Sequence, residues 1–509
     1  MGLDVQPPAR ARLDPASLRT RLFIDGKWVD AESGDEIDVI DPHDGSTITR
    51  IAEARTADVD RAVDAAERAF PSWAATAAAE RGRILLRVAD LVEANATELA
   101  TLETIDTGHP LRDSSRLDVP RTAATFRYFG GMADKHEGSV IPVEAGFLNY
   151  LLREAIGVVG QIVPWNFPLM FTSWKLGPAL AAGNTVVMKP SELTPLSTLR
   201  IAELLQEAGV PDGVVNIVPG YGATAGWAIA THPRVRKLSF TGSTAVGRRL
   251  VEASAPSLKR LQLELGGKGA NIVFEDANLP QAVRGSAFAI FHNQGQACIA
   301  GSRLLLHERI ADRFLDDFLR LATSIRLGDP LDMTTEMGPL TSAMHRDRVL
   351  KYVDVARAEG GEILCGGEAP DDPGLSRGYY VQPTVVRADA DATVSKEEVF
   401  GPFVVVTTFR DADEALRIAN STQYGLGSGL WTNDLSRGHR MAHLLNSGMV
   451  WVNAYKRVSP ASPFGGVLGS GYGREMGFEA MHEYTQPKSV WINVDAQLPD
   501  WYPRPDPGQ

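Results

Sequence analysis

The spacing of apolar residues divides the chain into an N-terminal helical region and a longer region in which strands and helices alternate. Apolar residues recur every three or four positions over residues 59–70 and 84–92, which predicts two amphipathic helices. Beyond them, β-branched runs that start roughly 25 residues apart alternate with helical stretches, as in βαβ units. These runs lie at residues 158–163, 185–188, 214–218 and 237–240. Continuous apolar strands between amphipathic helices predict a parallel sheet covered on both faces.

Shorter patterns predict further elements outside this sheet. Residues 23–29 have the pattern of a hairpin with an Asp-Gly turn. Residues 137–155 have the pattern of a second hairpin, with little core of its own. A second α/β region is expected from about residue 266 to about residue 458, with strands at residues 303–307, 384–386 and 403–409. We therefore expect an α/β fold, and the chain shows no internal repeat.

The composition excludes several classes of protein. With 509 residues the chain is too long for one core, and its size suggests roughly three domains. No apolar run approaches the roughly 18 residues of a membrane span, so we expect no membrane association. The formal net charge is −12 and there is no basic tract, so the chain would repel phosphate backbones and we expect no nucleic-acid partner.

The N-terminal segment and the cysteines bear on localisation. Residues 1–20 contain prolines and arginines but no apolar core for a secretory signal, which favours a flexible tail. A mitochondrial transit peptide is the alternative, and Asp4 and Asp14 count against it. Two cysteines cannot form a disulfide framework, and a reactive thiol suits a reducing compartment, so we expect a cytoplasmic protein.

Cys298 is the most informative residue for chemistry. It follows a polar, glycine-containing turn at the end of an apolar stretch, a setting that favours a reactive thiol. The flanks of Cys365, the other cysteine, are typical of a buried small hydrophobic residue. Glu264 lies upstream between two leucines, which indicates a buried carboxylate. A thiol nucleophile and a carboxylate base can divide a difficult carbonyl oxidation into two easier steps.

Several motifs resemble those of the aldehyde dehydrogenase superfamily, in the order that the family has them, from about residue 23 to about residue 492. Each motif alone has modest specificity, and together they are very specific. They are Pro-Trp-Asn-Phe-Pro at 164–168, Lys-Pro-Ser-Glu at 189–192, Phe-Thr-Gly-Ser-Thr at 240–244, Glu-Leu-Gly-Gly-Lys at 264–268, Gly-Gln-Ala-Cys at 295–298, Glu-Glu-Val-Phe-Gly-Pro at 397–402 and Pro-Phe-Gly-Gly at 463–466.

The resemblance implies three structural parts: a Rossmann-like parallel-sheet cofactor domain, a second α/β catalytic domain and a small β element for oligomerisation. It also implies a homodimer or homotetramer. The expected boundaries are a flexible tail at residues 1–20, the cofactor domain at 21–136 and 156–265, the catalytic domain at 266–458, the oligomerisation hairpin and strand at 137–155 and 484–500, and a segment returning to the cofactor domain at 459–483.

The resemblance also implies an NAD site. Gly242 permits a tight turn between a strand and a helix, and Ser243 can present a hydroxyl and an amide to a phosphate there. A glycine-rich loop near Gly222 lacks the acidic partner of a dinucleotide fingerprint, so we expect it near the adenine. Lys189 and Glu192 are implied to bind the adenosine ribose, and the Glu192 carboxylate would repel a 2′-phosphate, which favours NAD over NADP. The expected cofactor-binding residues are Ile162, Trp165, Lys189, Ser191, Glu192, Gly222, Phe240, Gly242, Ser243, Val246, Leu265, Glu398 and Phe400.

The implied reaction oxidises an aldehyde to a carboxylic acid. Cys298 attacks the aldehyde carbon, while the Asn166 side-chain amide and the Cys298 backbone N–H stabilise the oxyanion. Hydride transfer to NAD leaves a thioester, and Glu264 takes a proton from the water that hydrolyses it. A CoA-acylating relative would need no such base. Lys175 and Lys268 are candidates for the cation that lowers the pKa of Cys298.

The sequence gives a weaker indication of the substrate. Lys456 and Arg457 lie in the segment that borders the substrate entrance, and cations there favour aldehydes with a distal carboxylate. The aromatic residues of the pocket favour aliphatic or aromatic aldehydes instead. The expected pocket residues are Phe167, Phe171, Trp174, His292, Val458 and Phe464.

Other interpretations stay open on the sequence alone. A thiol hydrolase or acyltransferase could use Cys298 with His292 and no nicotinamide, although such Cys–His pairs usually come from distant positions. A non-catalytic binding protein would not need Cys298, Glu264 and Asn166 together. His439 and His443 have the i, i+4 spacing of metal ligands, but the zinc-protease glutamate and a third ligand are lacking, so we expect no metal.

Overall fold

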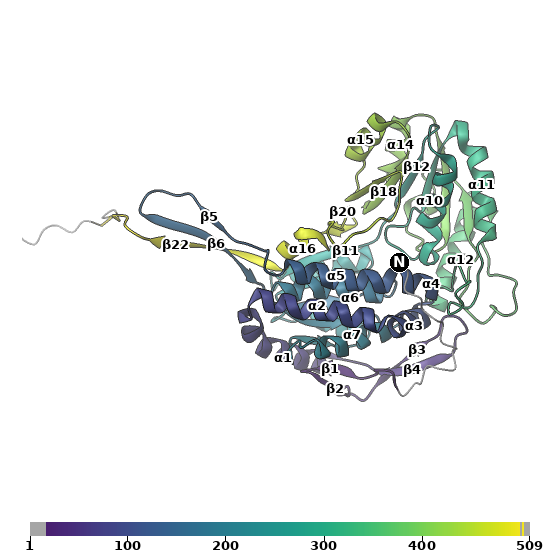
Figure 1. Cartoon of the computed structure of the whole chain (residues 1–509). Coiled ribbons are helices and arrows are strands. Elements are labelled where there is room, and N and C mark those ends of the chain that lie inside the picture. The colour runs from purple at the N-terminus through teal and green to yellow at the C-terminus, as the bar shows by residue number, and fades with distance from the viewer. Residues whose placement is uncertain (1–16, 499–500, 503–509) are drawn as a thin grey trace, which may run out of the picture.

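The strands of this chain form two large sheets and a projecting three-stranded arm (Figure 1). The computed structural model describes residues 17–498 and 501–502. Most of the expected N-terminal tail, residues 1–16, and residues 499–500 of the expected C-terminal strand lie outside the described residues. Within the described part of the chain, no helix combines the length and the hydrophobicity needed to cross a membrane.

The first sheet has a parallel centre whose strand order reverses once. Counted along the chain from β7, its five parallel strands have the spatial order 3-2-1-4-5, which is a Rossmann-like order with a switch point between β7 and β10. Antiparallel strands extend both edges. In spatial order the strands are β2 (Lys27–Val29), β1 (Leu22–Ile24), β9 (Val215–Ile217), β8 (Thr185–Lys189), β7 (Val158–Ile162), β10 (Lys237–Thr241), β11 (Arg260–Glu264) and β21 (Gly471–Tyr472).

Both faces of this sheet are buried, as the continuous apolar runs predict. In β8, Val186 and Met188 join one hydrophobic core while Val187 joins the other, because successive side chains point to opposite faces. The first core packs under α2 (Ala78–Ala94), α3 (Ala96–Thr107), α5 (Val119–Met132), α6 (Pro168–Ala181) and α7 (Leu196–Glu207). The second core packs under α1 (Thr56–Ala75), α8 (Trp227–Thr231) and α9 (Thr244–Ser254).

The local predictions in this region are confirmed. The two predicted amphipathic helices are α1 and α2, and the predicted hairpin is the β1–β2 pair. Its turn places Asp25 at φ 55° and Gly26 at φ 72°, the left-handed pair that a two-residue hairpin turn requires. A second antiparallel pair, β3 (Glu36–Ile40) and β4 (Thr47–Ala52), stands apart from the large sheet.

The second sheet is parallel except at one edge, where β14 is antiparallel. Its spatial order is β14 (Glu362–Cys365), β15 (Thr384–Arg387), β16 (Phe403–Phe409), β13 (Arg303–His307), β12 (Ala270–Val273), β18 (Gly427–Trp431) and β19 (Met449–Val452). Its helices are α10 (Leu279–Phe291), α11 (Ala311–Ser324), α12 (Ala343–Ala358), α13 (Thr393–Lys396), α14 (Ala412–Ala419) and α15 (Leu435–Leu444). The larger hydrophobic core continues from the first sheet into this one.

The remaining elements link the parts or extend away from them. A β-ribbon of β17 (Tyr424–Gly425) and β20 (Val467–Leu468) precedes β21 and α16 (Gly477–Glu483), which return the chain to the first sheet. The arm consists of β5 (Ser139–Ile141), β6 (Phe147–Ala155) and β22 (Thr485–Asn493), paired antiparallel, and it projects from the body (Figure 1). The short helix α4 (Leu111–Asp113) and a π-helical turn (Ser114–Asp118) precede α5.

The two large sheets meet at the carboxyl ends of the strands in the first sheet and the amino ends of the strands in the second. β10 and β11 end at Thr241 and Glu264, so the first sheet contributes the carboxyl ends of its strands. The chain then crosses directly to Ala270, the first residue of β12. The second sheet therefore contributes its amino edge, where loops lead into β13 and β16.

Candidate active site

A cavity with an empty volume of about 1040 Å³ lies where these two sheet edges meet. Its walls include the three residues expected to be catalytic, Cys298, Glu264 and Asn166. They also include six of the expected cofactor-binding residues: Trp165, Gly242, Ser243, Leu265, Glu398 and Phe400. These residues belong to motifs that lie far apart in the sequence, so the fold brings them together.

A strained turn presents Cys298 to the cavity. After α10 the chain makes a short 3₁₀ turn in which Asn293 and Gln294 both have φ 54°, a left-handed conformation that costs free energy in residues other than glycine. Hydrogen bonds hold it in place: Asn293 Nδ2 donates to the carbonyl of Asn166 (2.8 Å), and Gln294 Nε2 donates to the carbonyl of Gly108 (2.8 Å). The surrounding structure therefore fixes the nucleophile candidate by several contacts.

The surroundings of Cys298 disfavour its thiolate at rest. Burial raises the pKa of the Cys298 thiol to about 12, and the carboxylates of Glu398 and Glu264 add to the effect. The charge of Lys456 acts to lower the pKa of the Cys298 thiol. Of the cations suggested by the sequence, Lys175 pairs with Glu475 at 2.6 Å, and neither Lys175 nor Lys268 is among the main groups that shift the pKa of Cys298.

Glu264 is a buried carboxyl group at the end of β11. Its side chain is 2% exposed, and neither carboxylate oxygen has a hydrogen-bond partner among the described residues. Burial raises the pKa of Glu264 well above its usual value, and the nearby charge of Glu475 raises it further. A buried, unpartnered carboxyl group in a cavity is a candidate for carrying a proton during catalysis.

Asn166 keeps a donor available for the cavity. Its Nδ2 donates one hydrogen bond to the carbonyl of Gln296 (2.9 Å), and a side-chain amide has two N–H groups. The backbone N–H of Cys298 has no hydrogen-bond partner in the described part of the chain. Two N–H donors are therefore available near the candidate nucleophile, as an oxyanion site requires.

The first sheet offers a dinucleotide a place at its switch point. Ser243 is the N-cap of α9 and accepts a hydrogen bond from the N–H of Val246 at 3.3 Å, which confirms the predicted strand–helix turn. The exposed start of this helix favours an anionic group such as a pyrophosphate. The Thr241 hydroxyl is buried without a partner among the described residues, and Glu398 and Phe400 line the far wall. These residues fit NAD.

Seven expected cofactor-binding residues do not line this cavity. Lys189 and Glu192 pair with each other at 2.9 Å, and Lys189 borders the turn Gly222–Gly226, as does Ile162. They form a separate group on the same edge of the sheet. The seven residues are Ile162, Lys189, Ser191, Glu192, Gly222, Phe240 and Val246.

The sequence analysis missed a wall of this cavity contributed by the segment that leads into α12. His345 packs edge-on against Trp165 (ring centroids 5.0 Å apart), and its Nε2 lies 2.7 Å from the carbonyl oxygen of Phe400. No motif marks this segment, and only the fold brings it to the site. The cavity residues that were not anticipated are Pro164, Leu193, Thr241, Gly266, Ser342, Met344, His345 and Arg348.

A second, narrower cavity continues from Cys298 on the side away from α9. All six expected substrate-pocket residues line it, and Phe171 borders both cavities. Aromatic rings form its walls: Trp174 packs against Phe464 (centroids 4.9 Å apart), and Phe167 stacks on His292 (6.3 Å). Lys456, expected near the substrate entrance, also lines it, and the residues outside the expected pocket set are Arg121, Met170, Phe288, Ala297 and Ile299.

The expected pair of entrance cations is separated in the structure. Lys456 has φ 53°, and its side chain is buried against the second cavity, as expected for a residue that borders the substrate. Arg457 is exposed and does not line that cavity. The second cation of the cavity is Arg121 from α5.

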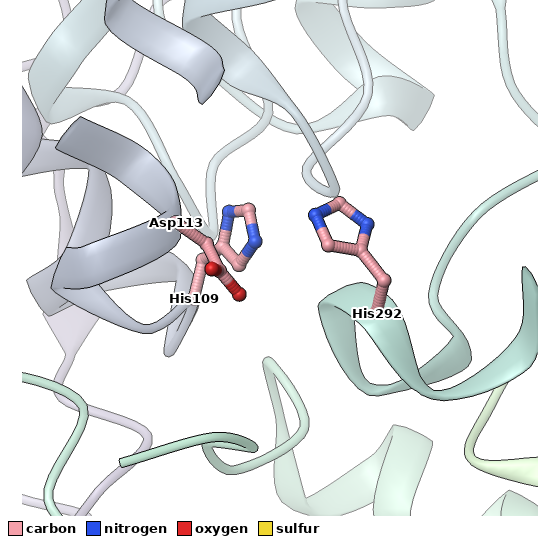
Figure 2. Close-up of side chains that lie close together, drawn as sticks. All are labelled: His109, Asp113 and His292. Carbon is pink, nitrogen blue, oxygen red and sulfur yellow. The ribbon is translucent and has the colours of Figure 1, made fainter. Parts of the chain in front are cut away.

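The described residues contain one cluster with the composition of a metal site, formed by His109, Asp113 and His292. Figure 2 shows the two imidazoles facing each other from different elements, with the Asp113 carboxylate beside His109. One atom from each residue lies within 4.8 Å of the others. His439 and His443, whose spacing suggested a metal, are exposed on α15.

Comparisons with known proteins point to one family. A family model described as the aldehyde dehydrogenase family matches residues 28–490. The chain is 44% identical to the mitochondrial aldehyde dehydrogenase of Homo sapiens, over 94% of this chain and 93% of that protein. It is 42% identical to the betaine aldehyde dehydrogenase of Bacillus subtilis (strain 168), over 94% of this chain and 99% of the relative.

Solved structures agree with this result. A crystal structure of PnpE in complex with nicotinamide adenine dinucleotide has 68% sequence identity and a TM-score of 0.95, covering 96% of this chain and all of that chain (100%). The NAD⁺ complex of an aldehyde dehydrogenase from Bacillus cereus has 42% identity and a TM-score of 0.93, covering 97% of this chain and 100% of that chain.

The raised pKa of Cys298 leads to a test on the free protein. Replacing Glu398 with glutamine removes a nearby negative charge, so the thiol pKa should fall and alkylation of Cys298 should move to lower pH. At a fixed pH below the midpoint, the rate should rise about tenfold for each unit of pKa lost. The measurement is the pH dependence of iodoacetamide labelling of the Cys298 peptide, followed by mass spectrometry.

Glu397→Gln is the matched control, since Glu397 is exposed, pairs with Tyr352 and is not among the groups that act on Cys298. It should leave the labelling curve in place. A Glu398→Gln curve that coincides with wild type, or moves to higher pH, would contradict the electrostatic account.

Proposed function

The chain belongs to the aldehyde dehydrogenase family and oxidises aldehydes with NAD as the acceptor, and we propose that Cys298, Glu264 and Asn166 carry the chemistry. The observation that most supports this assignment is the Glu264 carboxyl group, which is buried without a partner among the described residues and lines the same cavity as Cys298.

The first half of the proposed reaction forms a thioester on Cys298. Cys298 loses its thiol proton to solvent, and Sγ attacks the aldehyde carbon. The Asn166 amide and the Cys298 N–H donate to the oxyanion that forms. When the oxyanion collapses, the C–H bond breaks and the hydrogen leaves with its electron pair. NAD, when bound, accepts this hydride.

The second half releases the acid. Glu264, as a carboxylate, takes a proton from a water molecule. The resulting hydroxide attacks the thioester carbon, the C–S bond breaks, and the carboxylic acid leaves while Glu264 gives its proton to the Cys298 thiolate. The raised pKa of Glu264 suits this role, because a more basic carboxylate removes a proton from water more readily.

We propose the same domain boundaries as above: a cofactor domain at residues 21–136 and 156–265, a catalytic domain at 266–458, and a return segment at 459–483. The two large sheets support this division, since β12 to β16 with β18 and β19 form one sheet, and β7 to β11 form the centre of the other. We also propose the cytoplasm as the location, because Cys298 and Cys365 are free thiols.

We further propose that the arm joins copies of this chain into a dimer or tetramer. Its three strands expose large apolar side chains that a monomer would leave in water, such as Val140 (73% exposed) and Trp491 (53% exposed). An exposed sheet edge is also able to pair with another chain.

Glu264→Gln should separate the two halves of the reaction. Acylation should still produce a burst of NADH with one equivalent per active site, but steady-state turnover should fall by about 10² to 10⁴, since general-base catalysis contributes about that factor. Stopped-flow NADH absorbance checks this, with Cys298→Ser as the control that should show neither burst nor turnover. Normal single-turnover deacylation in Glu264→Gln would remove this residue as the base.

Glu192→Gln should improve the use of NADP. Removing the carboxylate removes the repulsion of a 2′-phosphate and leaves Lys189 to attract it, so the ratio of kcat/KM for NADP to that for NAD should rise about tenfold or more. Glu252→Gln, on the exposed face of α9, is the control and should not change the ratio. An unchanged ratio in Glu192→Gln would refute the proposed contact.

Trp491→Asp should weaken the proposed assembly. A charge in the apolar interface would be desolvated without a partner, so light scattering coupled to size exclusion should report a smaller species at the same concentration. Leu435→Asp alters a residue that is 76% exposed on α15, away from the arm, and should leave the mass unchanged. A monomeric wild-type protein, or an unaltered mass in Trp491→Asp, would contradict the proposal.

A further inference from the structure

Two basic side chains in the lining of the substrate cavity, Lys456 and Arg121, form no ion pair with a carboxylate of the described residues. Lys456 is 5% exposed, and the one hydrogen bond of its ammonium group within the described chain is a long one, 3.5 Å, to the backbone oxygen of His292. The guanidinium of Arg121 has no ion pair or side-chain hydrogen bond with any described residue, although the cavity encloses it. Both side chains line the cavity that Cys298 also lines.

The acidic groups of this region do not form ion pairs with Lys456 or Arg121. Burial lowers the pKa of Arg121, and the charge of Asp118 acts in the opposite direction. Asp118 lies 2.7 Å from Nδ1 of His109, in a pair with side chains only 1% and 0% exposed, and Asp113 accepts from Arg112 at 3.2 Å. Because charges in a protein interior are normally paired, two basic side chains without an ion pair favour an anion beside them.

The charge balance also argues against a metal ion at the histidine cluster of Figure 2. Lys456, Arg121 and Arg112 all act on His292 and, with burial, hold its pKa well below its usual value. A divalent cation placed there would meet the same repulsion. The neutral imidazole of His292 has both nitrogens buried without a partner among the described residues, so it can donate one N–H to an anion.

The remaining walls set the character of the rest of the ligand. Much of the remaining lining is aromatic, with the Lys456 ammonium 6.0 Å from the centre of the Phe288 ring and that ring 4.8 Å from His292. A chain that reaches from the sulfur to the cations therefore passes through apolar surroundings and ends at positive charge.

We propose that this cavity selects aldehydes that carry a carboxylate at the far end of a short apolar stem, with the carboxylate held by Lys456 and Arg121. This rests on the proposed function, since it places the aldehyde carbon at Cys298. The carboxylate is a negatively charged partner for the two basic side chains, and the neutral His292 imidazole can donate a hydrogen bond beside it.

The test compares succinic semialdehyde with its methyl ester, which has the same aldehyde and stem but no charge. The wild-type enzyme should show the higher kcat/KM with the acid. Lys456→Met and Arg121→Met should each lower the ratio of kcat/KM for acid to ester by about 10- to 100-fold, the factor expected for one lost charge-assisted hydrogen bond. Arg457→Met removes a nearby exposed cation and should change the ratio by less than about threefold.

A second readout requires no turnover. Succinate should slow alkylation of Cys298 by iodoacetamide in the wild-type protein and lose this effect in Lys456→Met, while butyramide, which has a similar stem but no charge, should not protect in either. Equal kcat/KM for acid and ester in the wild type, or ratios that survive both substitutions, would overturn the proposal. So would a Lys456→Met variant in which both substrates fall equally, because Lys456 would then serve only to ionise Cys298.

The two measurements separate this proposal from the proposed function. If no aldehyde gives NADH but succinate still protects Cys298 through Lys456, the reaction assignment fails and the anion site stands. If the ester is oxidised well and succinate does not protect, the reaction assignment stands and the anion site fails.

Discussion

The site depends on one close contact. The segment that crosses from the first sheet to the second packs tightly against the loops of the second sheet. The crossing contains Gly266 and Gly267: a side chain at Gly267 would clash with backbone, and one at Gly266 would displace the Glu398 carboxylate. A Cβ atom at Gly267 would lie 2.2 Å from the carbonyl oxygen of Cys298, and one at Gly266 would lie 2.5 Å from Oε2 of Glu398. Since Glu398 also accepts a hydrogen bond from the Gly267 N–H (2.7 Å), the crossing fixes the loops that carry the thiol and both carboxyl groups.

This contact also explains why the charged forms of the acidic groups in the site are disfavoured in the free protein. Bringing Cys298, Glu264 and Glu398 into one enclosed cavity raises the pKa of all three groups, with burial as the main cause. Groups held away from their usual protonation behaviour are typical of active sites. Lys456 and Arg121 line the second cavity, so the carboxyl groups lie on the cofactor side of Cys298 and basic side chains on the substrate side.

Much of this arrangement could be predicted from the sequence. Apolar periodicity predicts β7, β8, β9 and β10, and the leucines around Glu264 indicate its burial. The sequence could not reveal contacts made only by the fold. Arg121 lies on α5, far from Cys298 along the chain, and its surroundings look like those of any helix. Lys456 and Arg457 point to different surroundings because Lys456 has a left-handed backbone conformation. The presence of a lysine in the sequence does not predict that conformation. The wall from α12 likewise has no motif.

The central claim is that the aldehyde is oxidised while covalently bound to Cys298 in this cavity. Rapid quenching of the Glu264→Gln protein after mixing with NAD and an aldehyde, followed by peptide mass spectrometry, tests it directly. The account predicts that the Cys298 peptide gains the mass of the acyl group in proportion to the NADH formed, while the Cys365 peptide remains unmodified. NADH formation with an unmodified Cys298 peptide, or an acyl group on Cys365, would contradict it.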